Sequence, residues 1–71
     1  MRVTALANAM NTTSDTVRYY TKIGFITPSK SPTNGYKNYG KNAQNRLKFI
    51  LSARQLNFSV TEIKSILIES D

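Results

Sequence analysis

A short helix between Thr13 and Gly24, with a start signal at one end and a stop signal at the other, constrains the fold more than any other stretch of this sequence. Thr13 can cap its N-terminus, Asp15 in its first turn is favoured by the helix dipole, and Gly24 readily takes the left-handed conformation that ends a helix. We expect this helix to run to about Ile23. Another short helix is predicted just before it from four apolar residues at helical spacing, which are Val3, Leu6, Ala7 and Met10. Two short helices joined by a tight turn, here over about residues 4–23, have helix-turn-helix geometry.

The segment that follows, about residues 25–39, is predicted to form a small β-hairpin, or wing. It opens with a short apolar stretch that a proline closes, and the dipeptide Asn34-Gly35 is a strong signal for a hairpin turn. Pairing residues 25–30 with residues 36–39 would complete the hairpin.

Two further helices are predicted, at about residues 41–56 and 60–69. Asn57 can take the left-handed conformation that stops the first of them. Ser59 and Glu62 fit a capping box at the start of the second, since each side chain can bond the other residue's backbone N–H. The fold class is therefore mainly α, a winged helix-turn-helix in the order helix, helix, β-hairpin, helix, helix. The apolar residues expected in its core are Leu6, Val17, Ile23, Phe25, Leu47, Ile50, Leu51, Phe58, Ile63 and Leu67.

Basic charge is concentrated in the central region. Residues 16–41 contain five basic residues, four tyrosines and no acid. Residues 1–58 carry nine bases and one acid, a balance of +8, whereas residues 59–71 carry one base and three acids, a balance of −2. The alternative is a solvated basic face, but basic charge interleaved with aromatic side chains is typical of nucleic-acid binding. We therefore expect a polyanion partner, with the acidic tail pointing away from it.

The residue types that are missing exclude several classes of function. With no cysteine and no histidine, the chain has no disulfide, thiolate metal site or thiol nucleophile, and it lacks the commonest acid–base group. Its four scattered carboxylates offer no credible acid–base pair or metal cage, so we expect neither an enzyme nor a cofactor. No apolar run approaches the ~20 residues that span a membrane, which predicts a cytoplasmic protein. A chain of 71 residues is expected to form one domain, residues 1–71.

Four motifs follow one another along the chain. They are residues 16–20 (TVRYY), 23–28 (IGFITP), 34–39 (NGYKNY) and 53–59 (ARQLNFS). In order and spacing, and over nearly the whole chain, they resemble the DNA-binding domain of MerR-type transcriptional regulators. Four linked motifs are much more specific than a generic helix-turn-helix pattern.

The resemblance implies a function and its partners. Regulators of this family bind double-stranded promoter or operator DNA as dimers, with recognition helices in successive major grooves and wings on the flanking backbone. They typically distort an over-long promoter spacer so that RNA polymerase, the second implied partner, can engage both promoter elements. Family members normally continue into a long dimerising helix, whereas this chain stops at Asp71. We therefore expect a monomer in free solution that pairs, if at all, on DNA. The sequence leaves open whether the chain is a fragment or a natural minimal protein.

Three positions depart from the family's pattern. Lys37 stands where the wing usually has Arg, which keeps the charge but loses the planar fork that bonds phosphate. Thr21 replaces an acidic residue that is common after the tyrosine pair, so the surface becomes more basic. Asn57 replaces the usual glycine before Phe58, a tolerable change at a left-handed cap.

Ten residues are candidate DNA contacts. Arg18 lies one position beyond the inner-facing Val17, so we expect it to be exposed and to bind a phosphate. Tyr19 should also point outward, whereas Tyr20 lies at i+3 from Val17, where core packing is the stronger alternative. Tyr39 could serve only to close the hairpin against the core. The full set is Thr13, Ser14, Thr16, Arg18, Tyr19, Tyr20, Tyr36, Lys37, Asn38 and Tyr39.

The first turn of the recognition helix is where side chains approach base edges, so Ser14 and Thr16 are placed there. Thr13 could act only as the helix cap. Asp15 would repel phosphate, so any contact it makes should be to a base, such as the amine of a cytosine.

Two other functions remain as alternatives. One is an excisionase-like architectural protein that bends DNA for recombination, which the missing dimerisation helix favours. The other is a protein-interaction module that docks a partner helix on residues 60–68, where Ile68 lies off the inner stripe. The presence of Arg18, Tyr19 and Lys37 argues against this module.

Overall fold

The computed structural model describes the chain except for Ser31, Asn34 and Asp71, and the side chain of Ser70. Its elements are the helices α1 (Val3–Ala9) and α2 (Ser14–Lys22), the strands β1 (Ser29–Lys30) and β2 (Lys37–Asn38), and the helices α3 (Lys41–Gln55) and α4 (Val60–Ser70). The two strands pair in antiparallel orientation. The predicted mainly α fold, with a hairpin wing between two pairs of helices, is confirmed.

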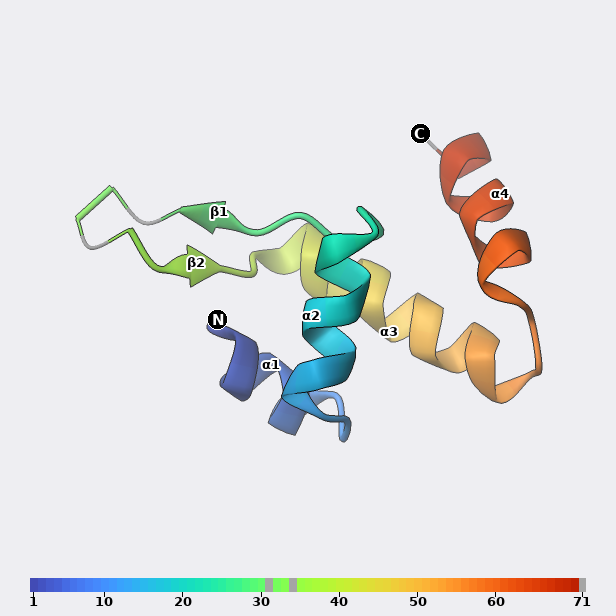
Figure 1. Ribbon diagram of the computed structural model, residues 1–71, viewed down its shortest axis with the longest axis horizontal. Coiled ribbons are helices and arrows are strands. Elements are labelled where there is room, and N and C mark those ends of the chain that lie inside the picture. The colour runs from blue at the N-terminus through green and yellow to red at the C-terminus, as the bar shows by residue number, and fades with distance from the viewer. Residues whose placement is uncertain (31, 34, 71) are drawn as a thin grey trace.

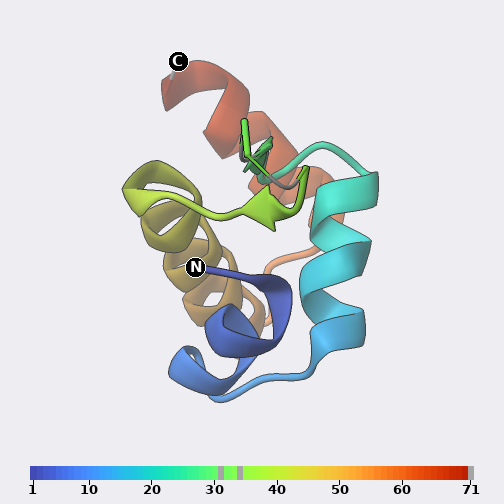
Figure 2. The ribbon, with the colours of Figure 1, turned by 90° about the vertical axis from the view of Figure 1, so that its left-hand side faces the viewer.

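The helices surround one core, and the wing and α4 project from opposite ends of the molecule (Figure 1). α3 runs through the middle, α2 crosses it, and α1 packs against α2. Seen from the end that carries the wing, α2 and α3 lie on opposite sides with α1 below them (Figure 2). The elongated outline measures 38 × 25 × 18 Å, so the two ends are well separated.

All of the helices and the base of the wing contribute to the core. Leu6, Val17, Leu47, Ile50 and Ile63 are completely buried, as predicted from their spacing. The other buried side chains of the cluster are Ala7, Tyr20, Phe25, Ile26, Tyr39, Ala43, Ala53 and Leu67. Leu51, also predicted to be inside, is only partly buried and packs against this cluster.

The wing strands are shorter than predicted. Among the described residues of the hairpin, pairing joins residues 29–30 to residues 37–38, so the expectation that pairing starts at Phe25 is wrong. Phe25 and Ile26 turn into the core instead, because the carbonyl of Tyr20 accepts both of their N–H groups at 2.9 and 3.3 Å. The predicted turn residue Asn34 lies outside the described residues.

Three helices end in the same way. One position beyond the C-caps of α1, α2 and α3 lie residues with left-handed backbone, Asn11 (φ 56°), Gly24 (φ 85°) and Asn57 (φ 67°). After each of them, the next N–H returns to the carbonyl five residues earlier, at N–O distances of 2.9, 2.9 and 3.1 Å. This is the Schellman motif, in which a left-handed residue lets the chain reverse and satisfies carbonyls at the helix end. Gly24 and Asn57 are confirmed as the predicted stops.

The prediction of burial is wrong for two residues, Ile23 and Phe58, because they lie at these chain reversals. Ile23 is the C-cap of α2 and is 37% exposed, since Phe25 and Ile26 fill the space below the helix end. Phe58 follows the left-handed Asn57 and is 38% exposed. Apolar spacing along a helix stops predicting burial at the residue where the helix stops.

The start of α4 is the predicted capping box. The N–H of Ser59 donates to Oε1 of Glu62 at 3.0 Å, and the N–H of Glu62 donates to Oγ of Ser59 at 3.1 Å. The backbone hydrogen bond from Ser59, and then its side chain, lower the pKa of Glu62 below its usual 4.5. At the end of α3, Nη1 of Arg54 donates to the carbonyl of Phe58 at 2.7 Å and bridges the reversal.

Candidate nucleic-acid interface

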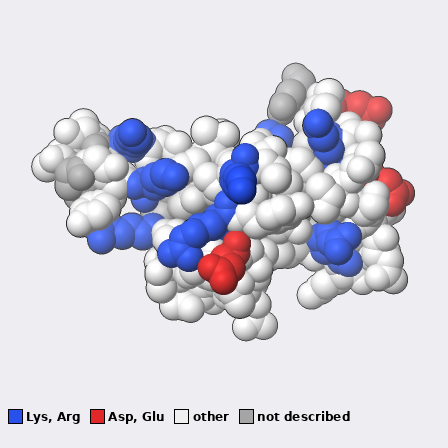
Figure 3. Space-filling model, viewed as in Figure 1, with Lys and Arg blue, Asp and Glu red and all other residues white. Residues whose placement is uncertain are grey.

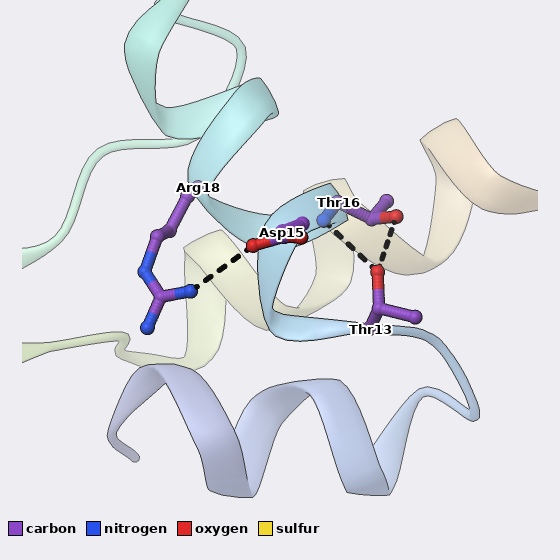
Figure 4. Close-up of polar contacts among 4 residues, drawn as sticks. All are labelled: Thr13, Asp15, Thr16 and Arg18. Carbon is purple, nitrogen blue, oxygen red and sulfur yellow. Dashed lines mark hydrogen bonds and ion pairs between the residues drawn. The ribbon is translucent and has the colours of Figure 1, made fainter.

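The first turn of α2 carries a bonded pair of threonines (Figure 4). Oγ1 of Thr13 accepts the N–H of Thr16 at 3.2 Å, which makes Thr13 the N-cap, and it lies 2.9 Å from Oγ1 of Thr16. Ser14 begins the helix and is partly exposed. The candidates Thr13, Ser14 and Thr16 therefore lie together at a helix end, where short polar side chains can reach base edges in a major groove.

Arg18 lies one turn further along α2, beside an acid (Figure 4). Its Nη1 is 3.4 Å from Oδ1 of Asp15, and the two side chains are 62% and 97% exposed. An ion pair this exposed contributes about 0.2–1 kcal/mol at most. The guanidinium of Arg18 can therefore exchange its carboxylate partner for a phosphate at little cost.

The tyrosine pair is divided between surface and core. Tyr19 is 47% exposed, whereas Tyr20 is buried and stacks on Phe25 with ring centroids 5.9 Å apart. The Tyr19 ring meets the Tyr20 ring edge-on at 5.2 Å, so the buried ring supports the exposed one. Tyr20 thus takes the packing role, and Tyr19 presents its ring to solvent.

The wing carries two lysines at directly paired positions of its strands. Lys30 of β1 pairs directly with Lys37 of β2, and Ser29 pairs with Asn38. The side chains of both lysines and of the adjacent Tyr36 and Asn38 are exposed. Like charges directly opposite in a hairpin repel one another, so an anion bound between them would be favoured.

Tyr39 closes the base of the wing from inside the core. Its hydroxyl lies 2.7 Å from Oγ1 of Thr21, which also donates to the carbonyl of Val17 at 2.8 Å. Because a threonine hydroxyl has a single proton, the Tyr39 hydroxyl must be the donor to Thr21. This chain of hydrogen bonds fastens the wing to α2, and it gives Tyr39 a positioning role.

A groove between α2 and the wing collects four cations, which are Arg2, Arg18, Lys22 and Lys37. Thr21 and Tyr39 also line it. Figure 3 shows Lys and Arg side chains running from the wing across α2, with a single acidic group beside them on this face. We call this feature the basic groove. Its geometry suits a polyanion backbone, because several cations face one open channel.

Sequence reasoning missed part of this groove. Lys22 is one helical turn beyond Arg18, so the spacing i, i+4 could have placed it on the same face. The sequence marks Thr21 only as a departure from the family pattern. Arg2 carries no signal in the sequence, because only the fold brings the beginning of the chain beside the wing, more than 30 residues away in sequence.

The acidic side chains lie away from the groove, with one exception. Glu62 and Glu69 belong to α4 at the end opposite the wing, and Asp15 pairs with Arg18. Asp71 lies outside the described residues. Within the described part of the chain, acidic residues form no cluster that could hold a metal ion. None of the helices in that part is long and apolar enough to cross a membrane.

Comparison with known proteins places this geometry in a family. The family model described as MerR HTH family regulatory protein matches residues 1–69. The HTH-type transcriptional regulator ZntR homolog of Haemophilus influenzae is 40% identical over 67 residues, which are 94% of this chain and 50% of that protein. The chain thus spans about half the length of the curated relatives it matches.

Two solved structures are similar over the whole chain. The crystal structure of the transcription regulator PbrR691 from Ralstonia metallidurans, determined with lead(II), superposes with a TM-score of 0.88 at 25% identity and is covered over 56% of its length. The cryo-EM structure of the EcmrR–DNA complex in EcmrR-RPo gives a TM-score of 0.82 at 30% identity and 27% coverage. With a family model that matches nearly every residue and a fold that agrees with it, this chain belongs to the MerR HTH family of regulatory proteins.

Proposed function

We propose that this chain binds double-stranded promoter DNA sequence-specifically, as the DNA-binding module of a MerR-type transcriptional regulator. The observation that carries the proposal is the basic groove, in which Arg18 and Lys22 of α2 face Lys37 of the wing. The acids of α4, Glu62 and Glu69, lie at the opposite end, so they do not weaken the attraction of the groove for DNA.

The proposed arrangement assigns different tasks to α2 and the wing. The first turn of α2, with Ser14 and Thr16, enters the major groove and approaches base edges. Arg18 and Tyr19 bind phosphates on one side of that groove, and Lys37 binds the flanking backbone from the wing. Contacts to phosphates position the module, and contacts to bases provide its specificity.

Further parts of the proposal rest on family membership. EcmrR, a similar protein, has been determined on DNA, and the curated relatives are named as transcriptional regulators. We infer the same role here: a non-enzymatic, cytoplasmic regulator that distorts its promoter as a dimer so that RNA polymerase can engage it. The operator sequence and the inducing signal are separate questions from this binding step.

The test is binding of two labelled duplexes across a salt series, one from DNA upstream of the coding region and one of random sequence. The variants are Arg18→Ala and the control Lys64→Ala, which removes the same charge from α4. We expect the upstream duplex to bind more tightly and affinity to fall steeply with salt. Arg18→Ala should lower the slope of log K against log salt by about 0.9, while Lys64→Ala leaves it unchanged.

Each other result supports a different function. Equal and weak binding of both duplexes, with strong bending of the DNA, would replace the proposal with the architectural, excisionase-like role. Absence of binding even at low salt would contradict any nucleic-acid function and favour the protein-interaction module.

A further inference from the structure

Arg2 lies against the wing although it precedes the first helix. The guanidinium carbon of Arg2 is 3.9 Å from the centroid of the Tyr36 ring, which is a close cation–π contact. The ring of Tyr36 is 55% exposed, so this contact lies at the surface of the wing. A charged side chain from the beginning of the chain therefore covers an aromatic residue that was expected to touch DNA.

The backbone holds Arg2 in this position from both sides. Just before it, the carbonyl of Met1 accepts the N–H of Tyr39 at 2.6 Å, so the chain runs beside the base of the wing. Arg2 is itself the N-cap of α1, and its carbonyl accepts the N–H of Leu6 at 2.9 Å. The Cα of Arg2 is thereby tied to both the wing and α1, and its side chain has a short reach to Tyr36.

The contact leaves the hydrogen-bond donors of Arg2 available. A guanidinium stacks on a ring through its face, whereas its five N–H groups point outward in its plane. Among the described residues, no acceptor bonds these N–H groups. The same side chain lines the basic groove beside Arg18, Lys22 and Lys37. Four neighbouring cations repel one another, so the groove gains most from an anion that all of them can approach.

We propose that Arg2 is a further DNA-binding residue, which Tyr36 holds at the basic groove so that its free N–H groups bind a backbone phosphate. This inference rests on the proposed DNA-binding function and adds a contact from outside the helix-turn-helix and the wing. It also gives Tyr36 a second task, since the ring orients the guanidinium in addition to meeting the DNA. The planar fork of Arg2 compensates at this groove for Lys37, which is a point charge without that fork.

The experiment measures affinity for a labelled random-sequence duplex of about 30 bp, roughly three helical turns, over a salt series. The variants are Arg2→Ala, Arg2→Lys, Tyr36→Leu, Tyr36→Phe and the double variants Arg2→Ala/Tyr36→Leu and Arg2→Ala/Tyr36→Phe. Lys64→Ala is the charge-matched control, and circular dichroism melting shows that each variant is folded. A random duplex suffices because phosphate contacts do not depend on base sequence.

Loss of one phosphate contact should lower the salt slope by about 0.9 and the affinity roughly 8-fold at about 0.1 M salt in Arg2→Ala, with little effect in Lys64→Ala. Arg2→Lys should restore the slope and part of the affinity, because charge remains without the fork. The loss of affinity caused by Arg2→Ala should be as large with Phe at position 36 as with Tyr, because the ring that orients the guanidinium remains. With Leu at position 36 this loss should be smaller, because the ring is gone.

Three results would overturn the inference, and they are distinguishable. If the wild type binds with a steep salt slope but Arg2→Ala behaves like Lys64→Ala, Arg2 makes no phosphate contact and the proposed function stands. If Arg2→Ala weakens binding equally in the presence of Tyr36 or Leu at position 36, the ring does not hold Arg2. If the wild type fails to bind any duplex at low salt, the proposed function and this inference fall together.

Discussion

Thr21 keeps the basic groove free of an added negative charge and also links α2 to the wing. Its hydroxyl donates to the carbonyl of Val17 and accepts the proton of Tyr39, so it joins the recognition helix to the base of the wing. An acid, which is common at this position in the family, would place a negative charge in the basic groove beside Arg18 and Lys37. With threonine there, the link between α2 and the wing is kept and the groove retains its full positive charge.

We predict that Tyr39→Phe lowers the free energy of unfolding by about 1 kcal/mol, the usual net contribution of one partly buried hydrogen bond. The ring stays in the core and only the hydroxyl bonded to Thr21 is lost. Urea denaturation measures the change, and Tyr19→Phe, with its exposed ring, is the matched control. Equal unfolding free energies for the two variants would show that the bond contributes nothing.

At the scale of the elements, reversals at helix ends shape the domain. The Schellman motifs after α1, α2 and α3 turn the chain back within a few residues, which keeps the helices close around a short core. Left-handed backbone costs an ordinary residue about 1–2 kcal/mol, whereas Gly and Asn tolerate it. The three positions are therefore restricted by backbone conformation and not by side-chain packing.

We predict that Asn57→Val lowers the free energy of unfolding by about 1–2 kcal/mol, because a β-branched residue resists the left-handed conformation at φ 67°. Asn57→Gly should retain or slightly raise stability. The control is Asn45→Ala, an exposed position within α3 where right-handed helix suits alanine. Thermal melting of the three variants gives the order, and a neutral Asn57→Val would contradict the role of the backbone.

At the scale of the molecule, the cations of the basic groove and the acids of α4 lie toward different ends of the long axis. The wing, α2 and Arg2 before α1 carry the cations of the basic groove. The acids Glu62 and Glu69 belong to α4 at the other end, where Figure 3 also shows Lys and Arg side chains. The cluster of cations draws a polyanion toward the groove, an effect that weakens as salt shortens the range of the field. The exposed Ile68 lies on α4, away from the basic groove, so the two surfaces can act independently.

Stability at this scale depends on a few large side chains. A domain of 71 residues is expected to have an unfolding free energy of roughly 4–10 kcal/mol. Leu47 and Ile50 of α3 are completely buried, and the other helices pack around them. Removing one of these side chains therefore takes away a large share of the total.

We predict that Leu47→Ala costs about 2–4 kcal/mol, through lost burial and the cavity that remains. Leu56→Ala is the control, because Leu56 is 72% exposed and its removal should change stability by less than about 0.5 kcal/mol. Calorimetry on both variants measures the difference. A Leu47→Ala variant that melts at the wild-type temperature would contradict the packing described for α3.

Much of the fold could be predicted because its signals are local. The cap at Thr13, the stops at Gly24 and Asn57 and the capping box at Ser59 each act within a few neighbouring residues, and the structure has all of them. Apolar spacing likewise identified the buried faces of the helices. These features follow from propensity and periodicity, so the sequence by itself determined which elements form and in what order.

Tertiary structure alone decided which residues at the ends of those elements are buried and which distant side chains come into contact. Ile23 and Phe58 are exposed, and Tyr39 is buried against Thr21, because burial at a reversal depends on segments that pack from elsewhere. Arg2 reaches Tyr36 only because the chain before α1 runs beside the wing. Such contacts join residues far apart in the sequence, where spacing and propensity carry no information about distance, and it is these contacts that assemble the basic groove.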